Sequence, residues 1–277
     1  MRRALPIFAF VAVTALLAFQ LRAQFGRGFG RLQQEGPYTP PDREFHFIRL
    51  EYTDLAASSR GFGFGSRNGR GVGWWLVDWP DADEHFSTGI TRLTRIDVGK
   101  PKHFRLLDDD RVYNFPWIYA TQTDRWGLSD AECARLGEYL RRGGFLVTDD
   151  MWGEESYTVF TSTMARVLPG KDIPDLAETD PVMHVLYDIR EKDRTFIPGS
   201  RHLFRGPDGK TQVYQPPGTS PAWRGMYDDH DHMVVAVNYD TDVADAWEFA
   251  DVPYYPENMT ALAYRYGINY IIYSMTH

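Results

Sequence analysis

The segment 114–155 constrains the fold of this chain more than any other stretch. Two short apolar runs, 116–120 and 145–148, lack alternation, which is typical of parallel strands covered on both faces. Between them, Ser129 precedes Glu132 at the spacing of a capping box, and apolar residues then recur at helical spacing. A strand, helix and strand of this size close right-handed onto a parallel sheet. The segment therefore predicts an α/β fold with a central, mostly parallel sheet and helices on both faces.

The rest of the chain supplies elements of the same kinds, recognised by apolar periodicity and by turn residues. We predict strands at 45–52, 223–227 and 233–238, short extended segments at 94–98 and 104–107, a helix capped by Asp81, helices at 157–168 and 256–273, and a turn-rich insertion with one hairpin at 199–222.

The N-terminus has the pattern of a targeting segment. Arg2 and Arg3 precede an apolar run, and Ala23 follows as a small residue before a possible cleavage point. We interpret residues 1–23 as a signal peptide, or alternatively as an uncleaved anchor, residues 24–41 as a linker, and residues 42–277 as a single α/β domain. The chain is then exported to the periplasm or the cell exterior, and only an uncleaved N-terminal segment would touch the membrane.

Charge and cysteine content exclude some classes of partner and of covalent structure. The net charge of −8 becomes −11 if residues 1–23 are removed, which argues against nucleic acid as a partner. Cys133 is the one cysteine in the chain, so an internal disulfide is impossible. Because Cys133 falls on the apolar face of its predicted helix, we expect it to be buried.

Acidic residues follow the second central strand. Asp149 and Asp150 come directly after the apolar run, and Trp152 and Glu154 stand at the start of the next helix. Ligands of open α/β sheets bind at the carboxyl ends of the strands. Two crowded carboxyl groups could act there as acid and base or bind a hard cation. The alternative is that these acids only cap the next helix.

The other central strand ends in hydroxyl side chains. A nucleophile elbow would place Ser or Cys at this point on a tight turn, but the residues present are Thr121, Gln122 and Thr123. We therefore expect Thr121 and Thr123 to line a pocket or to cap a turn. The predicted ligand-binding residues are Thr121, Thr123, Asp149, Asp150, Trp152 and Glu154.

A second polar cluster lies between the last two predicted strands. His230 and His232 would share one face of a strand, and with Asp228 they could bind zinc or another transition metal. The alternative is a solvated turn. A further acidic group, Asp245 and Glu248 around Trp247, could line a site, but a tryptophan in such a position is more often a packing anchor.

Several longer motifs together carry a resemblance to a known family. They are the segments 117–120, 128–150, 152–154, 164–169, 245–248, 255–256 and 267–277. Over residues 45–277 the chain resembles the bacterial domain of unknown function family 4159. The resemblance implies a flavodoxin-like fold similar to the class I glutamine amidotransferase-like group, and it implies no known activity. Members often carry His-Gly where this chain has Gln122 and Thr123, and no cysteine stands at the elbow, so glutaminase chemistry is not expected.

These observations favour a non-nucleophilic ligand-binding or assembly module of the cell envelope with an acidic pocket at the sheet's carboxyl edge. Its partner would be a small ligand or an envelope protein, neither of which the sequence identifies. The alternative is a hydrolase, with or without the assistance of a divalent metal, that uses Asp149 and Asp150 with help from His230 or His232.

Overall fold

The computed structural model describes residues 41–55, 73–107 and 110–277. The predicted signal peptide and all of the predicted linker except residue 41 lie outside the described residues. Within the described ranges, no helix combines the length and the apolar character needed to cross a membrane.

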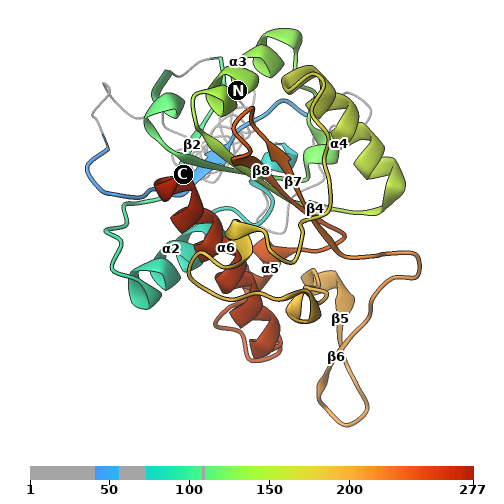
Figure 1. Cartoon of the computed structure of the whole chain (residues 1–277). Helices are drawn as coiled ribbons and strands as arrows, with labels where there is room; N and C mark the ends of the chain where they lie inside the picture. The colour runs from blue at the N-terminus through green and yellow to red at the C-terminus, as the bar shows by residue number, and fades with distance from the viewer. Residues whose placement is uncertain (1–40, 56–72, 108–109) are drawn as a thin grey trace, which may run out of the picture. The chain divides into compact units, whose positions relative to one another are not determined.

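A six-stranded sheet forms the centre of the structure (Figure 1). Five strands run parallel and the edge strand β7 is antiparallel to β8. In spatial order the strands are β2 (Lys102–Phe104), β1 (Ile48–Leu50), β3 (Trp117–Thr121), β4 (Phe145–Met151), β8 (Met233–Tyr239) and β7 (Ala222–Tyr227). The five parallel strands, counted along the chain, thus have the order 2-1-3-4-5 of a flavodoxin-like sheet. The predicted fold class is confirmed.

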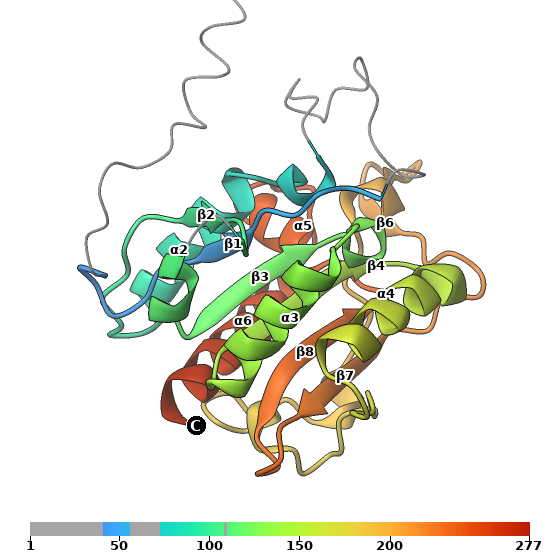
Figure 2. The ribbon, with the colours of Figure 1, turned by 90° about the horizontal axis from the view of Figure 1, so that it is seen from above.

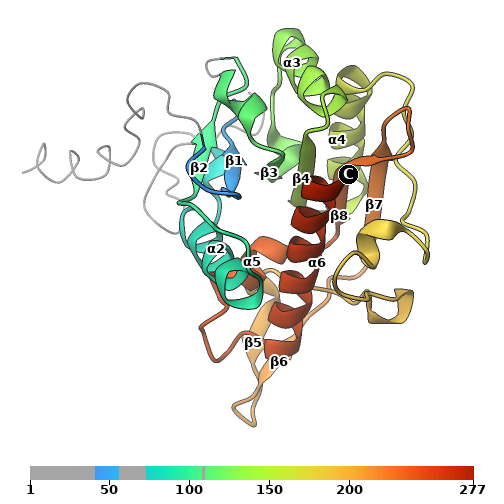
Figure 3. The same cartoon turned by 60° about the vertical axis from the view of Figure 1, so that its left-hand side comes forward.

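Helices cover both faces of this sheet. Figure 2 shows α3 (Asp130–Arg141) and α4 (Gly153–Val167) on one face, and Figure 3 shows α2 (Asp81–Leu93), α5 (Val243–Glu248) and α6 (Glu257–Thr276) on the other. The capping box at the start of α3 is present, because the Glu132 amide donates to the Ser129 hydroxyl and the Glu132 carboxylate accepts from the Ser129 amide at 2.8 Å. Cys133 is buried on the inner face of α3, as expected.

Aromatic side chains fill the core under α2, α5 and α6. Trp247 is fully buried and stacks on Phe86 with ring centroids 4.1 Å apart, which confirms the packing-anchor interpretation of Trp247. Gly267 allows this arrangement, because a Cβ atom at that position would lie 2.4 Å from the Phe86 ring and 2.8 Å from the Trp247 ring. The helix α6 can therefore approach the stacked pair closely.

Some predicted boundaries are wrong. The helix α2 begins at Asp81, but its N-cap is Pro80 and no side chain caps it. Residues 94–98 form no strand of the sheet beyond one bridge between Phe45 and Val98, and the edge strand β2 comes later. The short helix α5 was not predicted, since six residues are too few for a clear period. The predicted hairpin in 199–222 is present as β5 (Leu203–Arg205) and β6 (Thr211–Val213).

A buried ion pair joins the sheet to the segment before α2. The Arg49 guanidinium, in β1, binds both carboxylate oxygens of Asp83 in α2, with one donor–acceptor distance of 3.0 Å. The same guanidinium donates to the carbonyl oxygens of Trp75 at 3.1 Å and of Val77 at 2.9 Å. This network holds the backbone just before Asp78 against the sheet.

Candidate functional site

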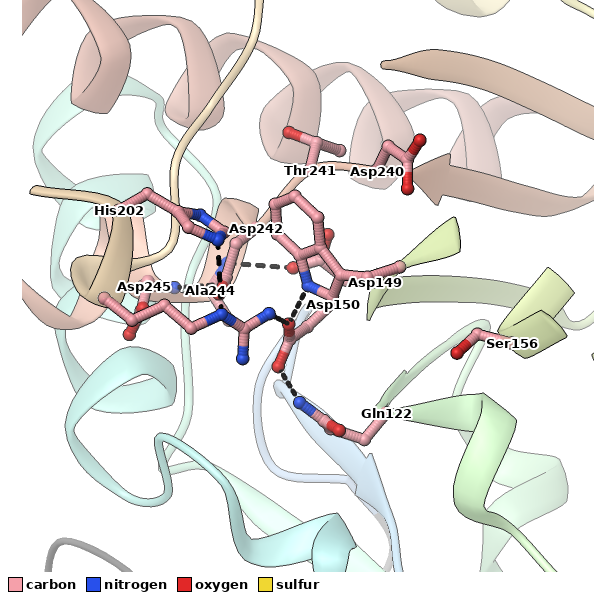
Figure 4. Close-up of polar contacts among 12 residues, drawn as sticks. Gln122, Asp149, Asp150, Ser156, His202, Asp240, Thr241, Asp242, Ala244 and Asp245 are labelled. Atoms are coloured by element: carbon pink, nitrogen blue, oxygen red, sulfur yellow. Dashed lines mark hydrogen bonds and ion pairs between the residues drawn. The ribbon is translucent and has the colours of Figure 1, made fainter. Parts of the chain in front are cut away.

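The carboxyl ends of β3, β4 and β8 bring acidic side chains together, as the close-up in Figure 4 shows. Asp149 and Asp150 lie at the end of β4, where the pairing with β8 shifts register. The Asp149 Oδ2 atom accepts from the Tyr119 hydroxyl at 3.2 Å and from the Ala244 amide at 2.9 Å. The Asp149 Oδ1 atom is buried and has no hydrogen-bond partner. Asp149 is thus tied to the start of α5 and keeps one free acceptor.

Asp150 lies beside Asp149 and has different partners. Its carboxylate accepts from the Gln122 side-chain amide and from the Trp152 indole N–H. It also pairs with Arg201 at 3.4 Å, and the Arg201 guanidinium stacks over the Trp152 ring at 5.0 Å. The Asp150 side chain is almost fully buried, whereas the Arg201 side chain is 55% exposed. Arg201 is therefore a partly hydrated counter-charge at the mouth of the cluster.

Three more carboxyl groups come from the turn before α2 and from α5. Oxygen atoms of Asp78, Asp242 and Asp245 all lie within 4.8 Å of one another. The Asp242 Oδ1 atom caps α5 by accepting from the Asp245 amide at 2.9 Å. The Asp245 Oδ2 atom accepts from the Ser200 amide at 2.5 Å. The Asp78 Oδ2 atom is buried and accepts no hydrogen bond. We call these three residues the aspartate triad.

Several residues around the site that are not glycine have left-handed backbone conformations. Among the described residues, five that are not glycine have positive φ, and four of them lie at this end of the molecule: Asp78 at 64°, Gln122 at 49°, Asp150 at 52° and Asp240 at 52°. Such conformations cost energy for residues with a Cβ atom and cluster at binding and catalytic sites. Here they turn the chain sharply at the strand ends, so polar side chains face one another.

Burial makes the charged forms of these carboxyl groups unfavourable. Desolvation, with further repulsion among the acids, raises the pKa values of Asp78, Asp149 and Asp242 well above that of a free aspartate. Desolvation raises the pKa of Asp150 to about 6, although Arg201 and the hydrogen bonds from Trp152 and Gln122 oppose the rise. The cluster therefore takes up protons, or cations, more readily than ordinary surface acids do.

The predicted ligand-binding residues are distributed unevenly around the cluster. Thr121 and Thr123 are fully buried at the end of β3, and neither hydroxyl has a hydrogen-bond partner. Trp152 lies inside the cluster through its bond to Asp150. Glu154 instead lies exposed in the first turn of α4, the position expected of an acid that interacts with the helix dipole.

The predicted transition-metal residues lie elsewhere. Asp228, His230 and His232 form the turn before β8, whereas Asp149 and Asp150 follow β4, which runs parallel to β8. The seven residues of β8, at about 3.3 Å each, separate this turn from the acidic cluster by roughly 20 Å. His230 and His232 donate their backbone amides to Asp228, and among the described residues these three side chains form no group with metal-ligand spacing. Help from these histidines to Asp149 and Asp150 is therefore excluded by distance.

Asp78, Asp242, Gln122 and Arg201 were not predicted as site residues, and Asp245 was considered only as one of the acids flanking Trp247, for which a packing role was favoured. The first acid after the apolar run 233–238 is Asp240, which stands two residues before Asp242. The spacing of Asp242 and Asp245 has the form of a helix N-cap and its third residue. No local sequence pattern predicts Asp78 or Arg201, because Asp78 reaches the site from the turn before α2 and Arg201 from a short 3-10 helix, both distant in sequence from β4.

A comparison with curated proteins finds no match to this chain. A family profile does match residues 67–275, and its description is domain of unknown function, DUF4159. The matched segment includes β2 through β8, the described helices up to residue 275 in α6, and every residue of the acidic cluster. It covers about three quarters of the chain, and the protein therefore belongs to the DUF4159 family.

Proposed function

We propose that this protein is an exported cell-envelope module that binds a positively charged ligand in the acidic pocket at the carboxyl edge of its sheet. The observation that carries the proposal is the excess of acidic over basic side chains among four buried aspartates and the partly buried Asp78. Asp78, Asp149, Asp150, Asp242 and Asp245 converge there, and Arg201 is the one cationic side chain with an ion pair to any of them among the described residues.

Electrostatics explains why such a cluster favours a cation. Two like charges about 4 Å apart repel by several kcal/mol at the effective dielectric constant of a protein interior near its surface. The cluster must then either bind protons or bind a ligand that brings positive charge. The unpartnered oxygens of Asp78 and Asp149 support the second choice, since a ligand with N–H groups or a metal ion would satisfy them.

The module is non-nucleophilic in this proposal. Gln122 stands in the left-handed turn that directly follows β3, the position where an elbow would present Ser or Cys. An amide side chain does not attack carbonyl or phosphoryl groups. Instead, the Gln122 amide donates to Asp150 and so orients the pocket.

Export rests on the charged and apolar pattern of residues 1–23. Fusion of residues 1–41 to a reporter enzyme that is active only outside the cytoplasm tests this part. We expect activity from the fusion and none from a version in which Asp replaces two leucines of the apolar run.

Thermal unfolding of the full-length protein tests ligand binding. At constant ionic strength, we expect either divalent metal ions or organic cations such as putrescine and arginine amide to raise Tm by several degrees. The double variant D150N/D242N should lose most of this shift. The matched variant E154Q, which removes an exposed acid at the same end of the sheet, should keep it. If neither class of cation changes Tm, the proposal is wrong.

Hydrolysis is the second candidate function. The observation in its favour is the pair Asp149 and Asp150, in which burial raises both pKa values and brings that of Asp150 to about 6, suitable for an acid–base group. A metal-assisted reaction would use a water molecule as the nucleophile. A panel of chromogenic esters, amides and phosphate esters tests this candidate. Turnover that D150N abolishes and E154Q preserves would favour the enzyme over the binding module.

A further inference from the structure

We infer that the aspartate triad binds a hard divalent cation of the Ca²⁺ class. This inference rests on the proposed cation-binding function and names both the ligand class and its position. The three side chains belong to different segments: Asp78 precedes α2, Asp242 is the N-cap of α5, and Asp245 lies in the first turn of α5.

The spacing of the triad fits one shared ion. One oxygen from each residue lies within 4.8 Å of the other two. Ca²⁺ binds oxygen at about 2.3–2.6 Å, so two oxygens on opposite sides of one ion are roughly 5 Å apart. All three oxygens can therefore contact the same ion in the observed positions.

A second observation points to a ligand at the same place. The Asp78 Oδ2 atom is buried and accepts no hydrogen bond, although burial of a carboxylate oxygen without a donor is costly. The Asp149 Oδ1 atom, on a side chain with no exposed surface, is also unpartnered, and its other oxygen binds the Ala244 amide between Asp242 and Asp245. A cation at the triad supplies the positive partner that the Asp78 Oδ2 atom lacks.

The protein's own cations do not occupy this position. Arg201 pairs with Asp150 rather than with the triad, and Arg49 binds Asp83 and two carbonyl groups. Within the described ranges, none of the three triad carboxylates forms an ion pair with a lysine, arginine or histidine. The ligand set is entirely oxygen, which favours hard ions over Zn²⁺, whose usual ligands include histidine and cysteine.

The segment that covers the triad is fitted closely to it. A Cβ atom at Gly199 would lie 2.7 Å from Asp242 Oδ2 and 3.2 Å from Asp245 Oδ2, and the next residue, Ser200, donates its amide to Asp245. The backbone therefore closes one side of the triad, and Asp242 Oδ2 faces this segment without a side chain between them. An ion in this position would be shielded from bulk water on that side.

Isothermal titration calorimetry and terbium luminescence test the inference with the full-length protein after treatment with a chelator. Trp79 is adjacent to Asp78 in the chain, so Tb³⁺ bound at the triad should be sensitised by tryptophan excitation and displaced by Ca²⁺. We expect one equivalent of Ca²⁺ to bind. D78N and D242N should each weaken binding at least tenfold, and E154Q should change it less than twofold.

D242N keeps the test valid if another substitution impairs folding. Asparagine caps a helix about as well as aspartate, so α5 should persist in D242N while one carboxylate is lost. Circular dichroism checks that the variants are folded. Ca²⁺ affinity that is unchanged in both D78N and D242N overturns the inference. Organic cations that bind while no divalent metal does would also overturn it and leave the proposed function standing; if neither class binds, both fail.

Discussion

The Arg49–Asp83 pair and the acidic cluster differ in how completely their charges are compensated by neighbouring groups. Arg49 and Asp83 form a closed pair: both side chains are fully buried, opposite charges meet in a two-pronged contact, and the remaining guanidinium donors reach backbone carbonyls. At the carboxyl edge, four buried aspartates and the partly buried Asp78 face one half-exposed arginine, and oxygens of Asp78 and Asp149 have no donor.

The difference separates a buried charge that is compensated within the protein from one that is compensated only in part. Desolvation penalises both groups, but the Arg49 pair compensates for it internally. The acidic cluster is compensated only in part, so it depends on protons or on a ligand from outside. Burial alone therefore does not separate the two groups; the presence or absence of matching partners does.

The largest expected effect comes from breaking the closed pair. R49M leaves the Asp83 carboxylate buried without its partner and releases the carbonyls of Trp75 and Val77, so we expect a loss of about 3–5 kcal/mol in the free energy of unfolding. Urea denaturation at pH 7 measures it. The double variant R49M/D83M, which removes both charges, should recover most of the loss. Equal stabilities of R49M and wild type would show that the Arg49–Asp83 pair does not stabilise the fold, contrary to its description as an internally compensated pair.

A pH titration of stability probes the open cluster. The pKa of Asp150 is raised to about 6 in the folded protein from an ordinary value near 4, so the protonated form favours folding. This contribution is complete below pH 4 and is lost as the pH rises through 6. Two pKa units correspond to about 3 kcal/mol.

The comparison with D150N isolates this contribution. Desolvation and the charge of Arg201 lower the pKa of His202 to about 4, which makes stability rise with pH over nearly the same range. Because the pKa values of Asp78, Asp149 and Asp242 are raised too, the pH dependence of wild-type stability sums several groups and does not report on Asp150 alone. Relative to wild type, D150N should gain about 3 kcal/mol between pH 4 and pH 7.5 in the absence of divalent ions. A difference that stays constant with pH would show that Asp150 titrates normally.

G199A addresses the covering segment of the triad. The added Cβ atom would push against Asp242, which cannot swing away freely because its Oδ1 atom caps α5. We expect Ca²⁺ to bind about tenfold more weakly, equivalent to about 1.4 kcal/mol. Calorimetry of G199A beside E154Q measures this effect, and unchanged affinity would mean that the segment does not shape the site.

The smallest effect on stability is expected from R201Q. The Arg201 ion pair is 3.4 Å long and its side chain is half exposed, so its removal should cost less than about 1 kcal/mol at pH 7. The loss of a positive charge beside the cluster should also strengthen Ca²⁺ binding a few-fold. A cost as large as that of R49M would mean that the open cluster is in fact a closed structural network centred on Arg201.

The sequence alone predicts the scaffold well, for a physical reason. Fully covered parallel strands need continuous apolar runs, and the helix between β3 and β4 carries its own start signal at Ser129 and Glu132, so local residues specify these elements. The same reasoning places Asp149 and Asp150 at the edge where ligands bind. It fails for α5, which is too short for periodicity to reveal.

What the sequence by itself determined is therefore the α/β scaffold, the buried Cys133 and the acids at the end of β4. Only the tertiary structure decided which side chains share the acidic cluster. Asp78 arrives from a turn, Arg201 from a short 3-10 helix, and Asp242 and Asp245 from the start of the unpredicted α5, while Asp228, His230 and His232 lie at the far end of β8. The reason is that the residues of a strand indicate whether that strand is buried. Which side chains come together at the end of the sheet depends on the direction of the neighbouring strands and on the path of segments distant in sequence.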